Sequence, residues 1–429
     1  MILFLAARPV VRRPAPAPAP RVRPRRARAR RASLLRPYRR LFATPGALSF
    51  TLAALVARLP GSMLGVSTVL MVALSRDSYA LAGAVSATGV AVTAVCSPLL
   101  GRLVDRYGQA KVAVPATGVF VLGAAAMLLC VHYRAPDWTL FLCAAGSSGV
   151  PGIGAMTRAR WAVIHKDDAA LRHTANSFEQ VVDEVCFMLG PALAMVLCTA
   201  VFPEAGLLTG AALLAVGTLA FAAQRATEPP PHPRDGVGPA ASPLRAGGVR
   251  VVLATFLATG AVFGSMEVAT VATVEAYGSG SASSAVLALQ AGGSCVAGLV
   301  FGALPVRGSA MGRFVAGVAA MAVAMLPLLA ADGLGSLAAL LFVAGMATAP
   351  TMITGMTLVQ RLVPDGRLNE GMTTVYTGLL VGISAGAATG GWAVERLGAG
   401  TAYAAPAAAA ALALAIALTG ALAGARRPR

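Results

Sequence analysis

The sequence predicts an all-α membrane protein in which twelve transmembrane helices form two six-helix bundles. Hydrophobic residues make up 57% of its 429 positions, and the mean hydropathy is +0.73. Charged residues make up 12%, against about 25% in soluble domains. Long apolar runs also recur along the whole chain, which is typical of a multi-pass membrane protein.

Each candidate span is an apolar run of about 18 residues or more, the length a helix needs to cross a bilayer. The first half contains the runs 47–74, 79–101, 112–132, 138–161, 177–200 and 203–223, and the second half contains the runs 249–274, 283–304, 312–331, 335–359, 371–393 and 400–424. The stretch between the halves is rich in Pro, Gly and charge, as flexible linkers are. We therefore expect a tail at 1–44, a bundle at 45–223, a cytoplasmic linker at 224–248, a second bundle at 249–424 and a cytoplasmic tail at 425–429.

The N-terminal tail holds 13 of the 35 basic residues in its first 40 positions, all of them arginine. Its Arg, Pro and Ala composition cannot build a core, so we expect disorder. The net charge of +18 would suggest a nucleic-acid arm in a soluble protein, but a cytoplasmic tail beside anionic lipid headgroups explains it better. The apolar stretch at 2–7 is too short for a signal peptide, and translation could begin downstream of it.

The distribution of Lys and Arg predicts which side of the membrane each loop faces. With the N-terminus in the cytoplasm, the outer loops hold only Arg76, Arg134 and Arg396, and the other basic loop residues lie inside. This asymmetry follows the positive-inside rule. We therefore expect both termini on the cytoplasmic side of the inner (plasma) membrane.

The two halves also match each other at a constant offset of 201 residues. The matched pairs are Gly101 with Gly302, Leu103 with Leu304, Arg106 with Arg307, Gly154 with Gly355 and Arg160 with Arg361. Two loops that share one offset indicate duplication. Transporters built from two repeats around a site at the membrane midplane have this arrangement.

The loop after the second span reads "GRLVDRYGQAKV" at 101–112. Gly101, Asp105, Arg106 and Gly108 match a loop motif of the major facilitator superfamily, and with the twelve spans and central linker the whole chain resembles that family. Gln109 and Ala110 depart from the basic pair of the motif.

The resemblance implies a role for the acid of this motif. In the family this acid faces the start of the eleventh helix across the two bundles and helps to latch the inner gate, where the helix dipole favours a negative charge. Here the acid is Asp105, and the eleventh helix is expected to begin at 369–373. The second copy of the motif has Val306 at the corresponding position, so the latch would be one-sided.

A Gly-Pro element in the fifth span, Gly190 and Pro191, resembles that of the family's proton-coupled, multidrug-type exporters. Other glycines usual around this element are missing. The arginine pattern of that group's fourth span is not evident either, because the arginines of the run 138–161 lie only at its cytoplasmic end. The resemblance therefore implies the fold and a proton-coupled exporter, with these two departures.

Ionisable residues inside spans are the strongest functional signal, because a charge at the bilayer centre costs about 2.5–3.5 kcal/mol on insertion scales. Arg58 lies near the middle of the first span, and Asp183 and Glu184 lie on one sector of the fifth. Arg58 and Asp183 form the natural pair. Two readings stay open: a buried structural ion pair, or a coupling site in which Asp183 or Glu184 takes up a proton and Arg58 sets its affinity.

Three further residues are also candidates. Glu267 in the seventh span is a candidate for proton coupling or substrate contact, and the alternative is a satisfied polar residue at a helix interface. Gln290 in the eighth span and Tyr376 in the eleventh are candidates for lining a substrate cavity.

Other functional classes fit poorly. The four histidines lie in predicted loops without metal-ligand spacing, the six cysteines lie in apolar runs, and no phosphate-binding loop is present. We therefore expect no metal, no cofactor, no nucleic-acid partner and no enzyme activity. The sequence predicts a monomeric secondary transporter that exports a small organic solute in exchange for protons. The alternatives are a proton-coupled metabolite importer and a non-transporting membrane sensor or scaffold.

Overall fold

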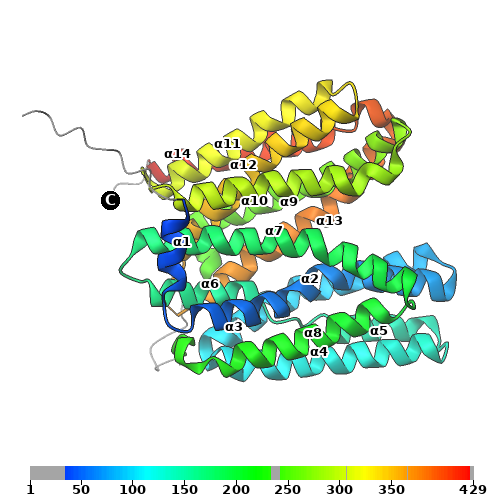
Figure 1. Cartoon of the computed structure of the whole chain (residues 1–429), viewed down its shortest axis with the longest axis horizontal. Coiled ribbons are helices and arrows are strands. Elements are labelled where there is room, and N and C mark those ends of the chain that lie inside the picture. The colour runs from blue at the N-terminus through cyan, green and yellow to red at the C-terminus, as the bar shows by residue number, and fades with distance from the viewer. Residues whose placement is uncertain (1–33, 233–241, 306, 365, 426–429) are drawn as a thin grey trace, which may run out of the picture. The chain divides into compact units, whose positions relative to one another are not determined.

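The computed structural model describes residues 34–232, 242–305, 307–364 and 366–425, and these form a helical membrane protein (Figure 1). Eleven helices in the described part are long and apolar enough to cross a membrane. The helices of the first half are α1 (Leu35–Phe42), α2 (Ala47–Arg76), α3 (Tyr79–Tyr107), α4 (Gln109–His132), α5 (Asp137–Gly146), α6 (Ile153–Ile164), α7 (Ala169–Ala200) and α8 (Ala205–Ala223). Those of the second half are α9 (Gly247–Ala276), α10 (Ser283–Ala303), α11 (Ala310–Met325), α12 (Leu334–Leu362), α13 (Leu368–Leu397) and α14 (Ala404–Ala425).

The predicted fourth span, 138–161, is not one helix. It is divided into α5 and α6 by a non-helical segment at 147–152. Pro151 has no N–H to donate to a helix, and Gly149 and Gly152 disfavour helix entropically. Irregular backbone at membrane depth is tolerated where it lines a cavity, and this segment does so.

The predicted disordered tail also requires a correction at its end, because α1 lies within it. Leu35, Tyr38 and Leu41 are spaced three residues apart and form one apolar stripe, of which Tyr38 and Leu41 are buried. The Tyr38 hydroxyl donates a hydrogen bond of 2.8 Å to the Leu299 carbonyl of α10. Burial raises the pKa of Tyr38 to about 12, so this donor stays protonated. The remainder of the predicted tail, 1–33, lies outside the described residues.

The predicted flexible linker has ordered ends. A short 3-10 helix, η1 (Arg225–Thr227), follows α8, and another, η2 (Pro243–Arg245), precedes α9. Glu228 accepts a hydrogen bond of 2.9 Å from the Ala110 N–H at the start of α4. The first part of the linker is therefore fixed to the first bundle, and the middle, 233–241, lies outside the described residues.

The helices pack as two groups that meet along equivalent surfaces. In the first half α2 packs against α7 and α8, and in the second half α9 packs against α13 and α14. Between the halves, α3 packs against α13 and α10 packs against α7 (Figure 1). Because α3 and α10 are the second spans and α7 and α13 the fifth, the two contacts are related by the repeat.

The repeated glycines sit at these two contacts. A Cβ on Gly101 would lie 2.9 Å from the Asn369 carbonyl oxygen of α13, and a Cβ on Gly302 would lie 2.9 Å from the Ser177 hydroxyl of α7. Only glycine permits such close approach of the helices. Val306, the expected counterpart of Asp105, lies outside the described residues.

Candidate functional site

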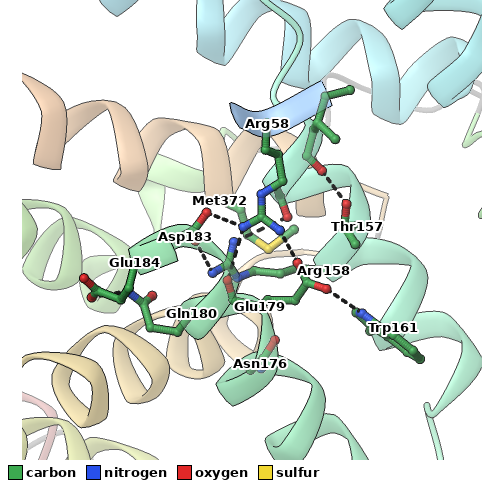
Figure 2. Close-up of polar contacts among 12 residues, drawn as sticks. Arg58, Thr157, Arg158, Trp161, Asn176, Glu179, Gln180, Asp183, Glu184 and Met372 are labelled. Atoms are coloured by element: carbon green, nitrogen blue, oxygen red, sulfur yellow. Dashed lines mark hydrogen bonds and ion pairs between the residues drawn. The ribbon is translucent and has the colours of Figure 1, made fainter. Parts of the chain in front are cut away.

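A buried cluster of charges joins α2, α6 and α7 (Figure 2). Arg58 of α2 donates to the carboxylates of both Glu179 and Asp183 on α7. Arg158 of α6 donates to the other oxygen of Asp183 at 2.7 Å. The expected pair of Arg58 and Asp183 is therefore part of a four-residue network of two cations and two anions.

Glu179 is the member of this cluster that lies deepest in the protein. It is fully buried and accepts a hydrogen bond of 2.8 Å from the Trp161 indole N–H. Trp161 packs edge-on against Phe50 with ring centroids 4.7 Å apart. This apolar backing makes the charges costly unless every one is paired.

The sequence did not reveal Arg158 as a member of this cluster. The hydropathy pattern places Arg158 at the cytoplasmic end of a continuous fourth span, but α6 is largely buried and the Arg158 side chain is 4% exposed. The signal was the Gly, Ser and Pro run at 147–152, which carries no charge and is averaged together with its apolar neighbours although it is not helical. Arg158 follows Gly154 by one helical turn and so faces the same side as the break.

Two adjacent cavities share part of their walls, and the inner one lies against the cluster. The inner one has a volume of about 160 Å³ and the outer one about 430 Å³. Arg58, Arg158 and Asp183 line the inner cavity, and Tyr376 of α13 lines both. The residues shared by both are Gly61, Ser97, Val150, Pro151, Gly152, Phe187, Tyr376, Thr377 and Leu380. The broken fourth span therefore forms part of the cavity wall.

The outer cavity extends away from the side on which α1 and the linker lie, here called the linker side. Its walls come from the second half of α2, the first half of α3, and Tyr376 to Ser384 of α13. On the linker side the bundles are held together instead. Asn176 of α7 and Gln360 of α12 exchange two side-chain hydrogen bonds of 2.9 and 3.1 Å, and the Thr174 hydroxyl donates to the Gly302 carbonyl at 2.9 Å.

Asp105 forms the most extensive of these linker-side contacts. Its carboxylate accepts hydrogen bonds from the N–H of Asn369 at 3.0 Å, the Asn369 side-chain amide at 2.8 Å and the N–H of Glu370 at 2.9 Å. These two N–H groups belong to the first turn of α13 and have no acceptor within that helix. Asp105 therefore caps α13 from the other bundle.

Removing this cap is expected to loosen the linker side. Asp105→Ala leaves three donors without their acceptor, and charge-assisted hydrogen bonds contribute about 1.5–3 kcal/mol each. We expect faster hydrogen–deuterium exchange at 368–373 and slower transport. The control is Arg106→Ala, since Arg106 is exposed and stacks on the neighbouring Tyr107. Equal exchange in both variants would rule out a latch at Asp105.

The glycines and proline of the family-like motifs have local structural reasons. Gly108 has φ +99°, which disfavours other residues, where the chain turns from α3 into α4. Gly190 lies against Ser62, whose hydroxyl donates to the Cys186 carbonyl at 2.7 Å. Pro191 removes an N–H within α7. Gly190 and Pro191 thus shape the α2–α7 contact beside the charged cluster.

The remaining candidates from the sequence lie in different surroundings: one at the interface between the bundles, one at the cavities, and two outside the cavities. Glu184 is next to Asp183 but points away from both arginines (Figure 2). It accepts hydrogen bonds from Gln180 at 3.1 Å and from Ser294 of α10, across the bundle interface, at 2.8 Å. Tyr376 lines the cavities, whereas Glu267 and Gln290 line neither of the two described above, and Glu267 is exposed.

No group of three or more His, Cys, Asp or Glu side chains that could hold a metal ion occurs in the described part of the chain. The carboxylates of the cluster are instead neutralised by arginine.

Comparison with known proteins gives a consistent assignment. The sequence model of the Major Facilitator Superfamily matches residues 50–334. No curated protein sequence matches the chain. Among solved structures, the human organic anion transporter MFSD10 (TETRAN) is 16% identical, with a TM-score of 0.64 over 87% of this chain and 100% of that one.

Two further solved structures have the same fold. A bacterial homologue of the iron transporter ferroportin, in an outward-facing state with soaked iron, is 14% identical with a TM-score of 0.69 over 87% of this chain and 98% of that one. The transporter FucP in the outward conformation is 15% identical with a TM-score of 0.62 over 86% of this chain and 98% of that one. At such identities the likeness extends to the fold alone.

Proposed function

Because the chain belongs to the major facilitator superfamily, and is thus a membrane transporter and not an enzyme, we propose that it exports a small organic solute in exchange for protons. The two bundles would rock about the central cavity and expose it to each side in turn. The observation that carries this proposal is the buried charged cluster at the cavity wall, which a purely structural scaffold does not need.

The arrangement of the bundles supports alternating access. Hydrogen bonds across the interface join the bundles on the linker side, while the outer cavity extends toward the opposite side. Breaking the Asp105 cap and the Asn176–Gln360 pair would release the linker side. Two arrangements that differ by a few such contacts can interconvert.

Glu184 is the best-placed group for coupling a proton to this rearrangement. Its carboxylate joins α7 to α10 through Ser294 and has no ion-pair partner among the described residues. Asp183 is different, because two guanidinium groups stabilise its charged form. Protonation of Glu184 would therefore change a contact between the bundles, whereas Asp183 would hold the cluster together.

The solute is proposed to be organic rather than a metal ion. MFSD10 is an organic anion transporter and ferroportin transports iron, so the fold accommodates both kinds of cargo. The described residues contain no group of three or more His, Cys, Asp or Glu side chains that could hold a metal ion. Hydroxyl groups and apolar side chains line the two cavities instead.

The surroundings of the protein follow from the same proposal. We place it as a monomer in the plasma membrane with α1, the linker and both termini in the cytoplasm, since the basic loop residues gather on that side. In this orientation the structure is closed to the cytoplasm, and its cavity extends toward the outside.

Flux into and out of proteoliposomes under an imposed pH gradient tests the proposal. A panel of organic anions, cations and neutral solutes should include at least one whose movement opposes the proton gradient and stops when the gradient is dissipated. Solute movement in the same direction as protons would identify an importer. No gradient-dependent flux of any solute would count against coupling to protons.

A further inference from the structure

Positively charged groups outnumber negatively charged groups on the wall of the inner cavity. Two guanidinium groups, of Arg58 and Arg158, line the inner cavity, and the one carboxylate that lines it is Asp183. Glu179, which balances the cluster as a whole, is fully buried behind it. The charged side chains that a solute would contact directly in the inner cavity are therefore two cations and one anion.

The wall of the inner cavity also has unused hydrogen-bond donors on its arginines. Each carboxylate oxygen of Asp183 already accepts a hydrogen bond, one from Arg58 and the other from Arg158. Each guanidinium has five N–H donors, and the Nε of neither arginine has an acceptor among the described residues. The Arg158 Nε is buried in that state, which is unfavourable unless a partner arrives.

Neighbouring groups on the cavity wall also offer donors. The hydroxyls of Ser97, Tyr376 and Thr377 line the cavity without a hydrogen bond to the described part of the chain. Gly152 to Ala155, at the start of α6, form another part of the wall. The N-terminal end of a helix favours negative charge.

We propose that the solute carried through this cavity is an organic anion, whose acidic group binds to the free N–H groups of Arg58 and Arg158. The acidic group lies at the inner cavity, and the apolar part of the solute extends into the outer cavity. An organic cation is disfavoured, because it would meet two arginines and a carboxylate that is already ion-paired with both of them. This inference names the substrate class and rests on the proposed function.

Three probes of the same shape test the inference: 4-phenylbutyrate, 4-phenylbutyramide and 4-phenylbutylamine. Their affinities for the purified full-length protein are measured from ligand-induced shifts in melting temperature. We expect the carboxylate to bind at least about tenfold more tightly than the amide, from one charge-assisted hydrogen bond, and the amine not to bind. Equal or tighter binding of the amide or amine, or no binding of the carboxylate, would overturn the proposal.

Two variants test the residues. The double variant Arg158→Gln, Asp183→Asn keeps the excess of one positive charge on the wall but removes the Arg158 guanidinium donors, so it should bind the carboxylate more weakly and prefer it less over the amide. Because this variant alters the cluster, Ser97→Asp provides a second test that leaves the cluster intact. It adds a negative charge to the wall and should shift preference toward the amine, whereas Ser97→Asn should not. An unchanged preference in Ser97→Asp would place the binding site elsewhere.

Flux measurements separate this inference from the proposed function. Binding that prefers the carboxylate, without flux that depends on a pH gradient, would support the anion site and reject proton coupling. Gradient-driven flux of the amine would support the exporter and reject the anion site.

Discussion

Asp183→Asn is expected to lower the free energy of unfolding by about 3–5 kcal/mol, because it removes one partner from a buried ion-pair network. Asp183 is 8% exposed and bonds to both Arg58 and Arg158. Without its charge, two arginines would face only Glu179. Melting temperature in detergent and the yield of monodisperse protein measure the loss.

A second substitution should restore part of this stability. Arg158→Gln combined with Asp183→Asn leaves Arg58 paired with Glu179, so charges again balance. We expect the double variant to be more stable than Asp183→Asn alone, with a coupling of about 0.5–3 kcal/mol, as found for residues in contact. Glu395→Gln is the control, since Glu395 is exposed on α13.

The opposite result would change the role of Asp183. If Asp183→Asn is as stable as the unaltered protein but no longer couples transport to a pH gradient, then Asp183 carries the proton. The structural ion pair and the coupling site, both compatible with the sequence, would thereby be separated.

Most of the fold could be predicted because hydropathy and charge act locally along the chain. Eleven of the predicted spans correspond to long apolar helices, and membership of the family is confirmed by the match over residues 50–334. The break at 147–152 could not be predicted by averaging hydropathy, since this short segment carries no charge and its apolar neighbours keep the average high. It depends on backbone preferences that an average does not contain.

The site was predictable only where both partners lie in long spans. Arg58 and Asp183 stand out because intramembrane charges are costly. Arg158 does not, because its place beside the cavity follows from the broken helix. Likewise Glu267 appeared equivalent to Glu184 in the sequence, but Glu184 contacts the other bundle and Glu267 is exposed. Such differences arise from tertiary packing alone.

The coupling role proposed for Glu184 leads to the second large effect. Glu184→Gln is expected to abolish solute flux driven by a pH gradient, because glutamine imitates the protonated side chain and cannot release a proton. Solute binding and solute–solute exchange should persist and become independent of pH. Flux with and without a gradient, measured in the same proteoliposomes, checks both expectations.

Ser294→Ala is the matched control for this substitution. It removes the hydrogen bond of 2.8 Å to Glu184 and keeps the carboxylate, so gradient-driven flux should be altered in rate but retained. If both variants lose flux equally, the contact between α7 and α10 matters and the proton does not. If Glu184→Gln keeps gradient-driven flux, the proton binds elsewhere, and Asp183 becomes the next candidate, because protonating it would release two guanidinium groups to the cavity.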